Sequence, residues 1–234
     1  MSLTRRERQH AATLAEIKDV AWRQIAASGA PALSLRAIAR EMGLTAPALY
    51  RYFPARDDLV TALIVDAYHS LADALEDARQ AHAPQAHYAR LQAAGNAYRG
   101  WALAHPQRYA LIFGTPIPGY VAPAEVTLPG AARALGILIE ILGAAHAAGR
   151  LHPQGEFAAL PAELAERYRA FGAGRGLDLP PEVLHMAVTS WLRLHGLVSL
   201  ELDGHFDSLL GSAEPLCAQL LDGLAVQFGL QPDV

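Results

Sequence analysis

The 234 residues suit one medium domain or a small domain joined to a larger one, and 52% hydrophobic against 18% charged residues excludes wholesale disorder. The single cysteine, Cys217, excludes an internal disulfide, and no cysteine or histidine spacing predicts a metal site or a bound cofactor. The net charge is −4, but it is distributed unevenly along the chain: residues 1–56 carry nine basic and four acidic side chains, and only the remainder is acidic. The N-terminal segment is therefore expected to bind a polyanion.

Neither export nor membrane insertion is expected. Residues 1–19 hold charges but no apolar run of the kind that a secretory signal needs. The longest apolar run, residues 131–149, is interrupted by Arg133, Glu140 and His146, which favours a buried helix over a membrane span. The sequence therefore predicts a cytoplasmic protein without a membrane partner.

Three helices are predicted at the start of the chain. Apolar residues recur at intervals of three and four over residues 10–28, which predicts the first helix. Ser34 and Thr45 are suited to cap the second and third helices, which Gly43 separates, and Pro54 ends the third. The positions expected to face inward on this pair are Leu35, Ile38, Leu44, Leu49 and Phe53.

Helical spacing continues to the end of the chain, and no strand-like alternation persists. Further helices are expected at residues 57–83, 87–105, 107–114, 130–149, 155–172, 181–203 and 212–229, with a proline-rich loop over 114–130. The predicted fold class is all-α. It consists of a three-helix domain with a helix-turn-helix pattern over residues 1–56 and a larger helical domain over residues 57–234.

The third helix, within "GLTAPALYRYFP", has the chemistry of a helix that enters a DNA groove. Pro47 costs no hydrogen bond in the first turn, because the first N–H groups of a helix have no intrahelical partner. The small side chains of Ala46 and Ala48 allow close approach, and their methyl groups can contact thymine methyl groups.

Longer side chains surround this helix. Tyr50, Tyr52 and Arg56 can donate hydrogen bonds to flanking phosphates, which sets the register without reading sequence. Arg36, in the first turn of the second helix, is suited to a guanine edge. Aromatic residues at this corner are alternatively part of the core, and that interpretation is preferred for Phe53.

Residues 10–60 resemble the DNA-binding domain of the TetR family of transcriptional regulators. The stretch "LSLRAIAREMGLTAPALYRYFPARDDLV" follows that family's pattern, except that Arg56 stands where lysine is usual. The resemblance implies DNA contacts from Ser34, Arg36, Thr45, Ala46, Pro47, Ala48, Tyr50, Tyr52 and Arg56. The preceding segment, with Arg5, Arg6 and Arg8, is either a further DNA contact or a disordered solvated tail.

A homodimer is expected for two reasons. One recognition helix makes too few base contacts to select one site in a genome, whereas two helices on a palindromic operator suffice. Helices 181–203 and 212–229 are also apolar on two faces, so each needs a second partner surface. By resemblance to the TetR family these two helices form an intersubunit four-helix bundle, and the regulator is a repressor.

A small-molecule effector is the remaining expectation. "SWLRLHGLVSLELDGHF" and "YRGWALAHPQRYALIFG" resemble the WHG type of TetR-like C-terminal domains. Aromatic side chains with a few polar tips suit a mostly apolar ligand, although such residues are also common in cores. The candidate ligand residues are Tyr98, Trp101, His105, Tyr109, Phe113, Trp191 and His195. Trp191 and His195 alternatively form a packing pair.

Three alternative functions have less support in the sequence. A DNA-binding protein without an effector would have a solidly packed body. A helical enzyme lacks support, because no HExxH, GxSxG, phosphate-binding loop or GxGxxG motif is present, and no catalytic residue is proposed. A helical scaffold would not explain the basic N-terminal segment.

Overall fold

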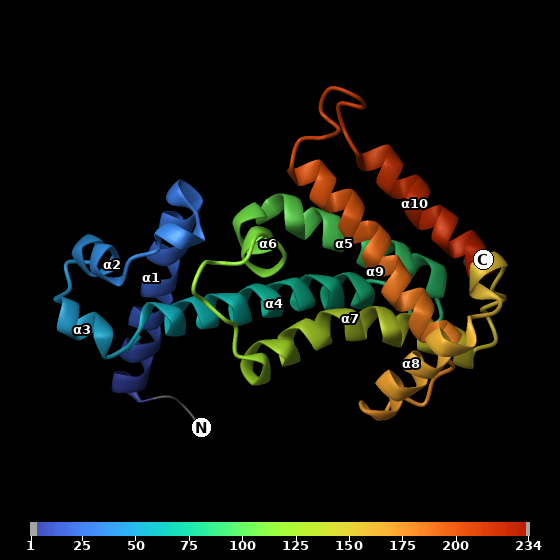
Figure 1. Cartoon of the computed structure of the whole chain (residues 1–234), viewed down its shortest axis with the longest axis horizontal. Helices are drawn as coiled ribbons and strands as arrows, with labels where there is room; N and C mark the ends of the chain where they lie inside the picture. Colours follow the sequence, from blue (N-terminus) through green and yellow to red (C-terminus); the bar gives the residue numbers. More distant parts are fainter. Residues whose placement is uncertain (1–3, 233–234) are drawn as a thin grey trace. The chain divides into compact units, whose positions relative to one another are not determined.

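The computed structural model describes residues 4–232, and every regular element within them is helical, which confirms the all-α class (Figure 1). The helices are α1 (Arg5–Ser28), α2 (Leu35–Glu41), α3 (Ala46–Tyr50), α4 (Arg56–Gln80), α5 (His87–Ala104), α6 (Pro106–Phe113), α7 (Ala124–Ala147), α8 (Ala162–Ala173), α9 (Pro181–Leu202) and α10 (Glu214–Gln227). Short 3₁₀ turns occupy Ala30–Ala32 and Gly155–Phe157.

The described residues form two compact units. The head unit comprises residues up to 68 together with 105–129, and the body unit comprises residues 69–104 and those from 130 onward. The head unit extends past residue 56, the boundary expected from the sequence, because Leu59 and Leu63 of α4 are fully buried in the core of α1–α3. Ile117, after α6, joins the same core.

Helix α1 begins earlier than the apolar spacing predicts, because a capping box starts it. The Thr4 hydroxyl accepts a hydrogen bond from the Glu7 N–H at 3.3 Å, and the Glu7 carboxylate accepts one from the Thr4 N–H at 2.7 Å. This exchange satisfies two N–H groups that the helix leaves without partners. Arg5, Arg6 and Arg8 therefore lie on a helix, which corrects the alternative of a disordered tail.

The two helices of the motif begin and turn as the sequence predicts. Ser34 accepts a hydrogen bond from the Ala37 N–H at 3.4 Å, and Thr45 accepts one from the Ala48 N–H at 3.3 Å. Gly43 makes the turn with φ of +64°, which side chains rarely allow. The cap positions therefore determine where α2 and α3 start.

Two predicted segments are corrected. The proline-rich loop ends at Pro123, whose carbonyl accepts the first hydrogen bonds of α7, so Pro129 lies inside a helix that was expected to begin later. Pro129 is in the second turn of α7, where proline removes the hydrogen bond to the carbonyl four residues earlier and its ring crowds that carbonyl, so α7 carries this cost near its start. The helix expected over 155–172 is reduced to a 3₁₀ turn and α8, which starts after Pro161.

Helix α7 is long and apolar enough to cross a membrane by length and composition alone, but it is a helix of the body core. Half of its most apolar 18-residue stretch is buried inside the protein. Its Glu140 and Arg133 form ion pairs with two residues of α4, namely Arg79 at 2.9 Å and Asp73 at 2.6 Å, respectively. These pairs tie α7 to α4 within the body unit.

The body unit packs α5 against both α9 and α10. Gly95 permits the closest approach, because a Cβ atom there would lie 2.4 Å from Leu221 on α10. Cys217, one turn earlier on α10, is buried in the same region, as expected of a small hydrophobe.

The burial of Cys217 predicts slow reaction with thiol reagents. Burial raises the pKa of its thiol above the ordinary value, so less of the reactive thiolate exists at pH 8. We expect the folded protein to react with a chromogenic disulfide reagent at least about tenfold more slowly than the unfolded chain. Equal rates with and without denaturant would contradict the burial of this residue.

Candidate DNA-binding surface

Helix α3 turns its apolar residues inward and its small residues outward. Leu49 is fully buried, and Phe53, just after the helix, is also in the core, which confirms the interpretation of both as core residues. Thr45, Pro47 and Tyr50 are exposed, and Ala46 and Ala48 are partly exposed. The N-terminal end of α3 therefore presents a narrow, uncharged surface to solvent.

Helix α2 contributes two of the predicted residues. The Ser34 hydroxyl is occupied as the cap of α2, and its backbone N–H donates to the Gln24 side chain at 3.3 Å. Arg36 is exposed and has no ion-pair partner among residues 4–232. Arg36 is therefore available to an external acceptor, whereas Ser34 is partly committed to the helix start.

The two tyrosines differ in their surroundings. Tyr50 is 40% exposed. Tyr52 is partly buried against the head core, and its ring stacks on that of His10 with centroids 4.8 Å apart. Sequence reasoning did not anticipate His10, because nothing in the local pattern indicates which residue of α1 meets the end of α3.

Arg56 is directed inward to the connection between α1 and α2. Its guanidinium donates to the carbonyl of Leu33 at 3.1 Å and to those of Ala30 and Pro31 at 2.9 and 3.1 Å. It also lies 3.6 Å from the Asp57 carboxylate. This network ties the start of α4 to the entry of α2, so we propose a positioning role for Arg56 in place of a phosphate contact.

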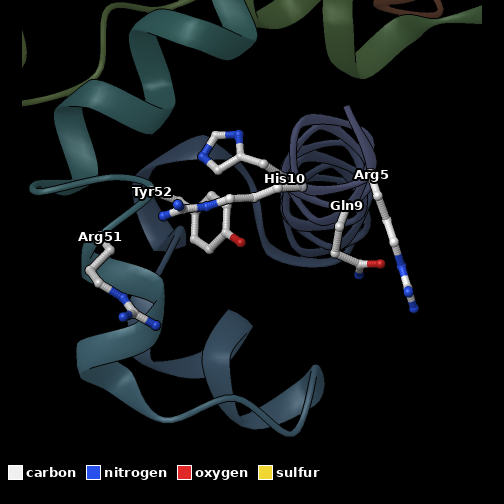
Figure 2. A pocket seen from close by; sticks show the side chains of 6 residues that line it. Arg5, Gln9, His10, Arg51 and Tyr52 are labelled. Carbon is white, nitrogen blue, oxygen red and sulfur yellow. The ribbon is translucent and has the colours of Figure 1, made fainter. Parts of the chain in front are cut away.

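A groove of about 700 Å³ lies between the start of α1 and the end of α3 (Figure 2). It is lined by Arg5, Arg6, Gln9, His10, Arg51 and Tyr52. No carboxylate is among these lining residues. Two other cations of the head unit are paired internally, Lys18 with Asp66 at 2.7 Å and Arg23 with Glu41 at 2.9 Å, whereas Arg36 on α2 is not. Unneutralised positive charge therefore gathers at this groove.

Four candidate ligand residues belong to the body unit. The Tyr98 hydroxyl and the Nδ1 atom of His195 lie 2.9 Å apart in a hydrogen bond. Trp191 packs against His195 with ring centroids 5.4 Å apart, and the Trp101 indole N–H donates to the Ser70 hydroxyl at 3.1 Å. Burial lowers the pKa of His195, which favours a neutral imidazole.

The other three candidates belong to the head unit. His105 directly precedes α6, and burial followed by the nearby Arg108 lowers its pKa. Tyr109 and Phe113 pack with centroids 5.1 Å apart, and Phe113 meets Tyr68 edge to face at 6.1 Å. The seven predicted residues are therefore divided between the two units, which their spacing in sequence does not reveal. Within residues 4–232, no cluster of three potential metal ligands occurs.

Comparisons with known proteins place this motif in a family. Residues 17–63 match the family model described as bacterial regulatory proteins of the tetR family, and residues 91–224 match the tetracyclin repressor-like C-terminal domain. The HTH-type transcriptional regulators Rv1816 of Mycobacterium tuberculosis and Mb1846 of Mycobacterium bovis are each 35% identical over 192 residues, covering 82% of this chain and 81% of theirs.

Solved structures with the same fold support the same family. The crystal structure of the candidate regulatory protein SCO4313 is 42% identical, covers 94% of this chain and 98% of its own, and superposes with a TM-score of 0.77. A regulatory protein of the tetR family from Rhodococcus RHA1 shares the fold at 18% identity, with a TM-score of 0.60 and coverage of 93% and 97%. The chain belongs to the TetR family of bacterial transcriptional regulators, carries that family's helix-turn-helix DNA-binding domain, and is a regulator rather than an enzyme.

Proposed function

We propose that this protein is a cytoplasmic, dimeric repressor that binds a palindromic operator and leaves it when an apolar small molecule binds. The observation that carries the DNA-binding part is the outward surface of α3, with small uncharged side chains at its N-terminal end beside the unpaired Arg36. Such a surface fits a major groove closely. The proposed contacts are Ser34, Arg36, Thr45, Ala46, Pro47, Ala48, Tyr50 and Tyr52.

Support for a dimer comes from apolar surface left exposed on α9 and α10. Leu192 and Leu200 of α9 are 60% and 46% exposed, and Val226 of α10 is 67% exposed. Gly196 lies between the two leucines on the same helical face and has open space around it, so another helix can approach closely there. We propose that this surface packs against its copy in the second subunit.

Support for an effector comes from the aromatic residues of the body unit. Tyr98 and Trp101 share a face of α5, and the Tyr98 hydroxyl meets His195. We propose that these residues, with Trp191, line a site for a mostly apolar ligand that has one hydrogen-bonding group. The name of the matching C-terminal model, tetracyclin repressor-like, supports both repression and release by a small molecule.

A regulator without an effector is the second candidate, because the hydrogen bond between Tyr98 and His195 already satisfies both polar groups. Thermal shift measurements with a library of apolar compounds distinguish the two. Stabilisation by one compound class that also weakens DNA binding would support the effector. A body that no compound stabilises would favour the second candidate.

Selection of bound sequences from a random duplex pool tests the DNA-binding function directly. We expect a palindrome, with log K falling steeply against log salt because several phosphates are neutralised. The recovered site then serves as the probe for variants. Failure to enrich any sequence at low salt would contradict the assignment of α3 as the sequence reader.

Arg36→Ala is expected to weaken binding and to relax preference at one base pair. Loss of one good bidentate contact to a base costs about 1–3 kcal/mol, or roughly 5- to 150-fold in affinity. Tyr50→Ala serves as the contrast, because loss of a phosphate contact should weaken all sequences about equally. Repeating the selection with each variant checks this, and an unchanged consensus for Arg36→Ala would remove its reading role.

A further inference from the structure

The connection between α9 and α10 presents apolar side chains to solvent. Figure 1 shows this connection projecting past the end of α9 and the start of α10. Leu209 and Leu210 within it are 73% and 52% exposed, and Phe206 is partly exposed. Exposed apolar side chains that gather at one place among polar neighbours are typical of protein interaction sites.

These apolar residues are held on a preformed turn, residues 204–211, which we name the α9–α10 turn. The Phe206 carbonyl accepts hydrogen bonds from the N–H groups of Leu209 and Leu210 at 3.1 and 2.8 Å. Gly204 and Gly211 bound the turn with φ of +74° and +69°, which side chains rarely allow. Because this backbone is already ordered, a partner that binds it loses less affinity to the ordering of the chain.

The spacing of the three apolar residues fits insertion into a groove. Phe206, Leu209 and Leu210 stand at positions i, i+3 and i+4, which share one face of a helical turn. Helical segments use this spacing to place apolar anchors in a groove on another protein. The α9–α10 turn therefore has the pattern of a short docking segment.

The charge around the turn is negative and has no internal counter-charge. Asp203 and Asp207 are exposed, and neither forms an ion pair within residues 4–232. No lysine or arginine follows Arg193 in the chain. A groove that is complementary to this turn therefore carries lysine or arginine at its rim.

A second copy of this chain does not supply such a rim through α9 and α10, the helices proposed to form the dimer. Arg193 is the only lysine or arginine on either helix. Its guanidinium donates to the Gln227 side chain at 2.7 Å and pairs with Glu156. A dimer formed through these two helices therefore offers the acids of the turn no free cation.

We propose that the α9–α10 turn is a docking site for a different protein, one whose surface has an apolar groove rimmed by lysine and arginine. Phe206, Leu209 and Leu210 fill the groove, and Asp203 and Asp207 meet the cations at its rim. The site lies within the body unit and uses none of the residues proposed to contact DNA or an effector. It gives the regulator a separate surface for a protein partner.

Selection from a displayed library of short random peptides supplies a defined probe. We expect the full-length protein to enrich peptides that combine leucine or phenylalanine with lysine and arginine. Fluorescence anisotropy with the most enriched peptide, synthesised with a fluorophore, then measures affinity. Leu209→Ser/Leu210→Ser should weaken binding about 10- to 100-fold, because two apolar anchors are lost. Val121→Ser/Leu128→Ser, which removes two exposed apolar side chains of the head unit, is the matched control and should bind like the wild type.

Asp203→Asn/Asp207→Asn tests the charged part of the site. We expect peptide binding to weaken about fivefold at low salt and to differ little from the wild type at high salt, because exposed charges are screened. Glu163→Gln/Glu166→Gln on α8 changes the net charge equally at acids that already have partners. This control should bind the peptide like the wild type at every salt concentration.

The remaining outcomes distinguish the occupants of the turn. Thermal melting of all four double variants should match the wild type, because every substituted side chain is exposed. The docking site is overturned if no peptide is enriched, if the enriched peptides lack cationic residues, or if they bind Leu209→Ser/Leu210→Ser undiminished. Sedimentation equilibrium of that variant tests the second copy: a dimer lost with the two leucines would mean that the partner subunit covers the turn, which also overturns the site. Operator selection by the same variant should return the wild-type consensus, so the proposed function is tested separately.

Discussion

Pro47→Glu is expected to abolish operator binding while leaving the fold intact. Pro47 lies in the first turn of α3 with its ring exposed, so a carboxylate there would face DNA phosphates in the proposed complex. Like-charge juxtaposition at an interface costs several kcal/mol, which corresponds to more than about 100-fold in affinity. The operator recovered by selection, used in fluorescence anisotropy, measures the effect.

Stability should respond differently from DNA binding. A glutamate in a first turn interacts favourably with the helix dipole, which offsets the lost rigidity of proline, so the free energy of unfolding should stay within about 1 kcal/mol. Pro47→Gln is the matched control, because it has the same size without the charge. Equal operator affinity for the glutamate and glutamine variants would mean that the first turn of α3 does not face DNA.

Arg99→Ala is expected to destabilise the body unit strongly. The Arg99 guanidinium on α5 donates two hydrogen bonds to the Glu201 carboxylate on α9, at 2.6 and 2.8 Å, and the hydrogen bond raises the pKa of Arg99. The two side chains are only 16% and 13% exposed. Removing one partner leaves a largely buried charge without compensation, which costs about 3 kcal/mol. Chemical denaturation at a fixed protein concentration measures this loss.

Two further variants separate the buried pair from general effects of charge. Arg99→Met/Glu201→Leu removes both charges and should recover most of the stability, because apolar residues of similar volume replace a buried pair at little cost. Arg169→Ala breaks an exposed pair with Glu166 and should cost less than about 1 kcal/mol. A double variant as unstable as Arg99→Ala would show that packing, rather than an uncompensated charge, is what the pair supplies.

In the head unit, the starts of α2 and α3 and the turn between them depend on interactions between residues that are close in sequence, and for this reason they could be predicted. The caps Ser34 and Thr45 act over three residues, and Gly43 turns the chain at a single position. Apolar spacing likewise located the buried Leu49 and Phe53. All these features depend on neighbours along the chain, so one sequence contains everything needed to recognise them.

The sequence by itself thus determined the all-α class, the helix-turn-helix and the family. Only the tertiary structure decided which distant residues meet: His10 on Tyr52, Arg56 on the carbonyls before α2, and Tyr98 on His195. It also divided the predicted ligand residues between two compact units. The physical reason is that such contacts depend on the path of the whole chain between the partners, and helical periodicity specifies a buried face but not the element that covers it.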